Sequence, residues 1–126
     1  MADGQRVILC IDDDPDILDT LVTAMERDGR FEVRTATRGF DAGVEANRFR
    51  PDILILDYML PDINGTLVCR TIRQSEEFQD MRILIISGVI KRREIDEIFQ
   101  AGADEFIKKP FEIESVISKV AEMVKV

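Results

Sequence analysis

Five polar side chains follow predicted strands at points where they could meet and do chemistry. Three are carboxylates, one is a hydroxyl and one is an ammonium group: Asp12, Asp13, Asp57, Ser87 and Lys109. Clustered carboxylates repel one another, so they must either take up protons or bind a cation. Oxygen ligands in this number suit Mg²⁺, and a lysine and a hydroxyl beside one acid could stabilise a phosphoryl group in transfer. The carboxylate would then be the nucleophile and form an acyl phosphate.

Alternating strand and helix patterns position these side chains. Apolar or alternating runs predict five strands, at residues 7–11, 31–35, 53–56, 83–86 and 105–108. Helices between and after them predict an open parallel α/β sheet with right-handed crossovers and helices on both faces. The second strand alternates with charged residues and the fifth is short, which fits edge positions and the flavodoxin-like (βα)5 order 2-1-3-4-5. In that order the ligand crevice lies beyond the carboxyl ends of strands 1 and 3.

The helices differ in the strength of their signals. The first has an N-cap at Asp14 and a proline, Pro15, at its first position. The second is weaker: Phe40 and Val44, with Phe49 as a third candidate, mark its expected apolar face, and Gly39 and Gly43 interrupt it. The expected apolar faces of the other three are Leu67, Val68, Thr71 and Ile72; Ile95, Ile98 and Phe99; and Ile113, Val116, Ile117, Val120 and Val124.

Composition narrows the functional classes. The 126 residues carry 17 basic and 25 acidic side chains, a net charge of −8, which argues against direct nucleic-acid binding by this chain. The absence of histidine excludes His-based catalysis from within the chain, and Cys10 and Cys69 fit buried reduced thiols. We find no long apolar segment and no signal-peptide pattern, and therefore expect a cytoplasmic protein without membrane contact. Residues 1–126 form one expected domain, with no output domain visible.

Each polar residue also has an ordinary structural interpretation. Asp14 and Asp16 fit helix-start residues. Ser87 taken alone fits a turn hydroxyl, and Asp12 with Asp13 could serve as capping residues. What the ordinary interpretations leave unexplained is the joint occurrence of these groups at four strand ends.

Several motifs resemble the receiver domain of two-component response regulators. They occur in order across essentially the whole chain: Ile11-Asp-Asp, Leu56-Asp57 with Pro61 and Gly65, Ile86-Ser87-Gly88, Ala101-Gly-Ala-Asp, and Lys109-Pro110-Phe111. The resemblance implies that Asp57 accepts a phosphoryl group from a histidine on a sensor kinase or phosphotransfer protein. It implies that the protein is not an enzyme beyond assisting its own phosphorylation and autodephosphorylation.

The resemblance also implies the roles of other residues. Asp12, Asp13, Asp57 and the Met59 backbone carbonyl would bind Mg²⁺, with Mn²⁺ as a substitute. Lys109 would pair with a phosphoryl oxygen, and the Lys109-Pro110 peptide bond would be cis. Ser87 would move to hydrogen-bond the phosphoryl group, and Phe106 would follow it inward. That movement would change the surface made by the fourth helix, fifth strand and fifth helix, which would control an output domain or partner.

Some residues depart from the family pattern. Ser87 replaces the commoner threonine, and Phe106 lacks a phenol oxygen, so packing alone must hold its inward position. Met59 and Val89 are apolar where family members often carry polar groups that position attacking water. Our hypothesis is that these two side chains shield the acyl phosphate and prolong its life, because hydrolysis needs an ordered in-line water.

A basic cluster, Lys91-Arg92-Arg93, opens the fourth helix, where the helix dipole disfavours positive charge. It fits a solvated cluster, and the alternative is pairing with acids on the same surface of a second copy, such as Asp96, Glu97 or Asp104, in a phosphorylation-dependent homodimer.

Three other functions compete. A phosphohydrolase of the haloacid-dehalogenase type would need an acid at position 59, where this chain has Met59. A nucleotide-binding domain would need a glycine-rich loop after the first strand, where this chain has acids. A degenerate receiver would lack Asp13, Asp57 or Lys109, and all three are present.

Overall fold

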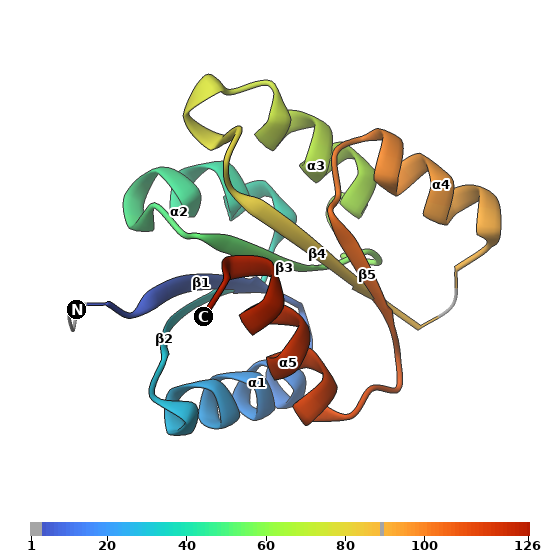
Figure 1. Ribbon diagram of the computed structural model, residues 1–126. Coiled ribbons are helices and arrows are strands. Elements are labelled where there is room, and N and C mark those ends of the chain that lie inside the picture. The colour runs from blue at the N-terminus through green and yellow to red at the C-terminus, as the bar shows by residue number, and fades with distance from the viewer. Residues whose placement is uncertain (1–3, 89) are drawn as a thin grey trace.

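The computed structural model describes residues 4–88 and 90–126, and its five strands form one parallel sheet (Figure 1). The strands are β1 (Arg6–Ile11), β2 (Phe31–Ala36), β3 (Ile53–Asp57), β4 (Arg82–Ser87) and β5 (Glu105–Lys108). Their order is β2-β1-β3-β4-β5, which confirms the predicted flavodoxin-like arrangement with β2 and β5 at the edges.

Helices cover both faces of the sheet and make three layers (Figure 1). The longer ones are α1 (Pro15–Asp28), α2 (Ala42–Phe49), α3 (Gly65–Arg73), α4 (Arg92–Gln100) and α5 (Ile113–Val124), with short 3-10 helices η1 (Gly39–Asp41) and η2 (Glu76–Phe78). Helices α1 and α5 share one core cluster, whereas α2, α3 and α4 share the other. None of the helices in the described ranges is long and apolar enough to cross a membrane.

The central strands explain why their sequences are apolar throughout. In β3, Leu54 and Leu56 belong to the core cluster on the α2–α3–α4 side, whereas Ile53 and Ile55 belong to the cluster on the α1–α5 side. All four are essentially inaccessible to solvent. Because side chains alternate between the faces of a strand, a strand covered on both faces must be apolar at every position.

The boundaries of α1 match their sequence signals. The Asp14 side chain accepts a hydrogen bond from the Asp16 N–H at 2.9 Å, and Pro15 occupies the first helical position. Gly29 ends the helix with φ of 89°, a left-handed conformation that glycine adopts without a Cβ clash.

The prediction that Phe40 and Val44 form the buried face of α2 is wrong. Ala42 and Ala46 are buried against the sheet, while Phe40 and Val44 are 67% and 65% exposed. The small alanine side chains allow this short helix to lie close to the sheet, so the larger apolar residues take the outer positions. On α3 the prediction is half right, because Val68 and Ile72 are buried whereas Leu67 and Thr71 are exposed.

A network around Arg73 stabilises the end of the sheet where β4 and β5 begin, which is the end opposite to the carboxyl ends of the strands. The guanidinium group donates to the carbonyl oxygens of Met81 at 2.6 Å, Phe78 at 2.8 Å and Gly102 at 3.1 Å. It also pairs with the Asp104 carboxylate at 2.9 Å. One side chain thus joins the end of α3 to the segments that precede β4 and β5.

Candidate functional site

Three carboxylates gather where β1 and β3 end. Strand register pairs Ile11 with Leu56, so the next residues, Asp12 and Asp57, follow adjacent strand positions. One carboxylate oxygen from each of Asp12, Asp13 and Asp57 lies within 4.8 Å of the others. Asp12 and Asp57 are buried, whereas Asp13 is exposed. The sheet therefore brings together the acids that the sequence predicted would meet.

Lys109 reaches this cluster from the segment after β5. Its Nζ lies 3.2 Å from Asp12 Oδ2 and 3.5 Å from Asp57 Oδ2. Its backbone N–H donates to the Ser87 carbonyl oxygen at 2.8 Å, which fixes the segment against β4. The Lys109-Pro110 peptide bond is cis, as the resemblance implied.

The electrostatics of Asp57 reflect a crowded, partly dry site. Burial and the negative charge of Asp12 raise the pKa of the Asp57 carboxyl group. The Lys109 charge and a hydrogen bond from the Met59 backbone N–H, at 3.2 Å, lower it. Two acids with one lysine leave this carboxylate incompletely compensated, and an added cation would stabilise its charged form.

Ser87 is fully buried at the end of β4, beside the residue that pairs with Asp57. Its Oγ has no hydrogen-bond partner among the residues that the structure describes. A buried hydroxyl without a partner is costly, and such groups are uncommon in folded proteins. The hydroxyl is therefore free to bind an acceptor that arrives at the site.

The remaining predicted site residues surround this centre. Phe106 is half-buried in β5 and packs against the core cluster under α4. The Met59 side chain is 63% exposed in the loop after Asp57. Val89 lies outside the described residues.

A family comparison matches this arrangement. The family model described as the response regulator receiver domain matches residues 8–121. The chain belongs to the receiver domain family.

Named relatives and solved structures agree with the assignment. The chain is 32% identical to the DNA-binding dual master transcriptional regulator RpaA of Synechocystis sp., over 94% of this chain and 48% of the relative. It is 33% identical to the alkaline phosphatase synthesis transcriptional regulatory protein PhoP of Bacillus subtilis, over 95% and 49%. A putative response regulator structure from Chloroflexus aurantiacus is similar with a TM-score of 0.88 and 29% identity, over 97% of this chain and 99% of that one.

A signal receiver domain from Bermanella marisrubri is similar with a TM-score of 0.86 and 30% identity, over 95% of this chain and 98% of that one. The chain spans about half the length of the two curated relatives named above. Receiver domains are signalling domains rather than classical enzymes, and they bind Mg²⁺ at an acidic pocket. The carboxylate oxygens of this receiver are the donors that Mg²⁺ prefers, and the incomplete compensation of Asp57 fits a bound cation.

Sequence reasoning missed a contact between the site and α4. The buried Tyr58, which follows Asp57, lies with its hydroxyl 3.3 Å from Glu94 Oε2, and burial raises the pKa of Tyr58. The other Glu94 oxygen accepts the Lys91 N–H at 2.9 Å, which caps the start of α4. Glu94 three residues after the N-cap was a visible capping signal, but nothing in the sequence indicated that Tyr58 would reach it.

Proposed function

We propose that Asp57 of this receiver accepts a phosphoryl group from a phosphohistidine of a sensor kinase or phosphotransfer protein. An Asp57 carboxylate oxygen attacks phosphorus, and the phosphorus–nitrogen bond breaks. The imidazole of the partner histidine is the leaving group, and an acyl phosphate forms on Asp57. The observation that carries the proposal is the meeting of Asp12, Asp13 and Asp57 within 4.8 Å, with the Lys109 ammonium 3.5 Å from Asp57.

Lys109 and Ser87 supply complementary support to the transferred group. The Lys109 ammonium already bridges Asp12 and Asp57, so a small shift would bring it to a phosphoryl oxygen. The Ser87 hydroxyl, which has no partner among the described residues, would donate to another phosphoryl oxygen.

Asp12, Asp13, Asp57 and the Met59 backbone carbonyl would hold Mg²⁺, or Mn²⁺ in its place. The bound cation would neutralise part of the charge on the carboxylates and on the transferring phosphoryl oxygens. Without it, the Asp12 charge opposes ionisation of Asp57.

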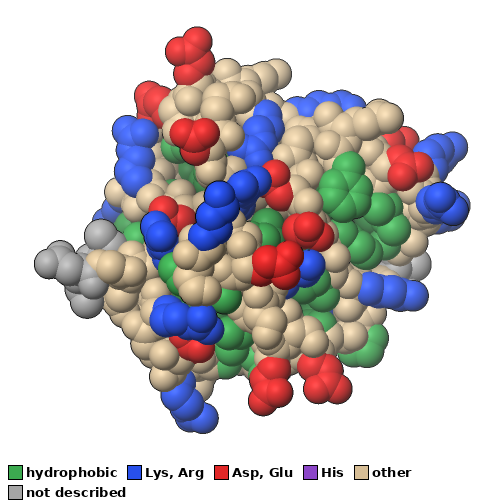
Figure 2. Space-filling view, in the orientation of Figure 1, with side chains coloured by type: hydrophobic (Ala, Val, Ile, Leu, Met, Phe, Trp, Pro, Cys, Tyr) green, Lys and Arg blue, Asp and Glu red, His purple; other side chains and the backbone are tan. Residues whose placement is uncertain are grey.

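The output surface would be the face made by α4, β5 and α5. Movement of Ser87 toward the phosphoryl group would leave space for Phe106, which is half-buried and packs against the core cluster that α2, α3 and α4 share. Figure 2 shows hydrophobic side chains gathered on the face of α4 and β5, with Lys and Arg side chains at its border. Phe99 on this face is 42% exposed. An inward Phe106 would change what this surface offers to an output domain or partner.

The basic cluster at the start of α4 keeps its two interpretations. Arg93 lies 3.8 Å from Glu97 of the same helix, with both side chains largely exposed, as expected of a solvated pair. The alternative is a homodimer formed on phosphorylation, in which these cations meet acids of a second copy. Asp104 is unsuited to that role because Arg73 and Arg82 already bind it.

Acetyl phosphate with Mg²⁺, followed by intact-mass measurement, tests the central proposal. Wild-type protein should gain the mass of one phosphoryl group, and Asp57→Asn should gain none. Chelation of the metal should abolish the adduct on the wild type. An equal adduct on Asp57→Asn, or no adduct on the wild type, would refute the assignment of Asp57.

A further inference from the structure

The loop of residues 59–64, between β3 and α3, is attached to η1 by one carboxylate. Asp62 accepts hydrogen bonds from two consecutive backbone N–H groups, those of Gly39 at 3.1 Å and Phe40 at 3.0 Å. The bond from Phe40, and then the one from Gly39, lower the pKa of the Asp62 carboxyl group, which favours its charged form. One side chain thus ties the tip of the loop to the segment that follows β2.

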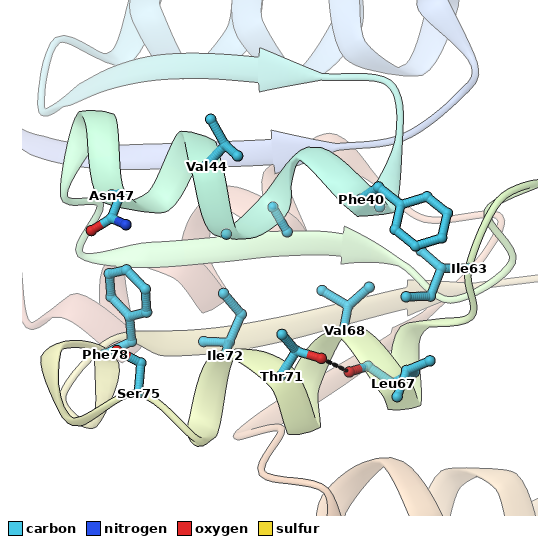
Figure 3. Close-up of a pocket in the computed structure, with 13 residues that line it drawn as sticks. Phe40, Val44, Asn47, Ile63, Leu67, Val68, Thr71, Ile72, Ser75 and Phe78 are labelled. Atoms are coloured by element: carbon cyan, nitrogen blue, oxygen red, sulfur yellow. Dashed lines mark hydrogen bonds between the residues drawn. The ribbon is translucent and has the colours of Figure 1, made fainter.

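Gly39 allows the same two segments to pack closely. A Cβ at this position would collide with Cγ2 of Ile63 and would lie 3.1 Å from Cδ1 of Leu60. Leu60 is buried, and Ile63 packs against the same core cluster. Figure 3 shows Ile63 beside Phe40, where the loop meets η1. We call the contacts that Asp62 and Gly39 make across this junction the clasp.

The base of the same loop contacts the proposed phosphoryl acceptor. Met59 and Asn64 form an antiparallel bridge, and the Gly65 N–H donates to the Tyr58 carbonyl oxygen at 2.9 Å. The Met59 N–H donates to Asp57 Oδ1 at 3.2 Å. The position of the loop therefore determines where the Met59 peptide group meets Asp57.

A loop held only at its base is free to tilt about that base. A tilt would turn the Met59 N–H away from Asp57 and would move the Met59 carbonyl, the proposed cation ligand. An attachment at the tip removes this freedom, and functional groups must be held within about 0.5 Å of the productive geometry. Outer residues that orient metal ligands typically contribute roughly 10- to 100-fold to metal affinity.

We propose that Asp62 is a positioning residue of the phosphorylation site. By tying the loop tip to η1, it holds the Met59 peptide group where that group meets Asp57 and the bound cation. This role rests on the proposed function, which makes the Met59 carbonyl a cation ligand. Asp62 acts through the loop, so a looser clasp weakens cation binding. A bound cation in turn draws the loop back into place, so the reaction at saturating cation is preserved.

Mn²⁺ binding to the full chain tests the proposal without any reaction, because electron paramagnetic resonance measures the free ion. Asp62→Ala removes both acceptor oxygens and should weaken Mn²⁺ binding about tenfold. Asp62→Asn keeps one acceptor oxygen and should weaken binding about threefold, which is half of that loss in free energy. Both variants remove the same charge, so a long-range attraction between Asp62 and the cation would weaken binding equally in the two.

A pair of glycine variants tests the clasp without a change of charge. Gly39→Ala places a methyl group against Ile63 and Leu60 and should weaken Mn²⁺ binding by at least about threefold. Gly43→Ala makes the same substitution in α2, where nothing lies within 4 Å of the new Cβ, and should leave the affinity unchanged. Cooperative urea unfolding of each variant establishes that the compared proteins are folded.

Phosphorylation by acetyl phosphate at increasing Mg²⁺ concentration separates positioning from a loss of structure. In Asp62→Ala, the Mg²⁺ concentration that gives half of the maximal rate should rise about tenfold. The maximal rate should stay within about twofold of wild type, because the bound cation restores the loop. A lower maximal rate at an unchanged half-maximal concentration would give Asp62 a structural role alone and would overturn the proposal.

Three other results would overturn it. Equal Mn²⁺ affinities of wild type and Asp62→Ala would show that the base of the loop alone positions Met59. Equal weakening in Asp62→Ala and Asp62→Asn, with no effect of Gly39→Ala, would assign the effect to charge. Absence of Mn²⁺ binding to the wild type, or binding that Asp13→Asn leaves unchanged, would refute the proposed metal site itself, and the positioning role with it.

Discussion

Replacement of Ser87 by alanine should stabilise the unphosphorylated protein, although Ser87 sits at the centre of the site. Its hydroxyl is fully buried and has no hydrogen-bond partner among the described residues. Burial of an unpaired hydroxyl costs about 1–3 kcal/mol by mutational measurements. Loss of the oxygen leaves a void of about 15 Å³, worth about 0.4 kcal/mol. The expected net change is therefore a gain of about 1 kcal/mol in the free energy of unfolding.

The same substitution should have the opposite effect once the site is filled. A hydroxyl that donates to a charged acceptor contributes about 1.5–3 kcal/mol. Beryllofluoride with Mg²⁺ can stand in for the phosphoryl group on Asp57. The stabilisation that it gives should be smaller by about 2 kcal/mol in Ser87→Ala than in wild type, or about 30-fold in apparent affinity.

Urea unfolding with and without beryllofluoride measures both effects. Asp57→Asn is the control for binding, because it should gain nothing from the ligand. Ser87→Thr keeps the hydroxyl, so its response to the ligand should remain near that of wild type. If Ser87→Ala lost more than about 1 kcal/mol without ligand and gained as much as wild type with it, the hydroxyl would have a partner in the resting state. Its assignment as a phosphoryl donor would then be wrong.

Three further predictions concern stability and the lifetime of the acyl phosphate. Arg73→Met should lower the free energy of unfolding, measured by urea titration, by about 3 kcal/mol, because three carbonyl oxygens and a carboxylate lose their hydrogen-bond donor. Arg82 has a half-exposed side chain and a longer ion pair, so Arg82→Met should lower it by less than about 1 kcal/mol in the same titration. Burial raises the pKa of Cys10 and of Cys69 to about 12. Stability should therefore be intact below about pH 8 and should fall between about pH 9 and 12 by up to about 1.4 kcal/mol per pH unit per thiol, because unfolded thiols ionise there and folded ones do not. Urea titrations at several alkaline pH values should show a smaller slope for a variant with alanine at both cysteines, and equal slopes would count against buried thiols as the cause. Met59→Asn should accelerate autodephosphorylation, because an amide at this exposed position can order water. The rate is measured as the loss of the phosphoryl mass adduct over time, and an unchanged or slower rate would contradict shielding by Met59.

The sheet and the acid cluster could be predicted because each depends on short local signals. An apolar run that ends in an acid, such as β3 with Asp57, predicts a buried strand and also places the acid at the carboxyl end of that strand. The parallel order then brings Asp12 and Asp57 to adjacent positions without any further information. The approach of Lys109 follows in the same way from the end of β5.

The sequence-based predictions failed where they depended on which element packs against a given helix face, because the sequence does not specify that neighbour. Phe40 and Val44 fit a helical apolar stripe, and periodicity alone gave no reason to choose Ala42 and Ala46 instead. The choice depends on how closely α2 approaches the sheet, which is a tertiary property. The contact of Tyr58 with Glu94 is likewise set by the placement of α4 rather than by any pattern near either residue.

The two ends of the strands differ in how completely the polar groups near them are paired, and this difference suits a receiver. At the end where β4 and β5 begin, Arg73 and Asp104 form an ion pair and hydrogen-bond to the nearby backbone. A ligand at this end would therefore add little stabilisation. At the carboxyl ends of the strands, the pKa of Asp57 is raised and the Ser87 hydroxyl lacks a hydrogen-bond partner among the described residues. A ligand shifts an equilibrium only through contacts that one state makes and the other does not. If Asp57 accepts a phosphoryl group as we propose, these unsatisfied groups are the ones through which it would change the balance between two conformations.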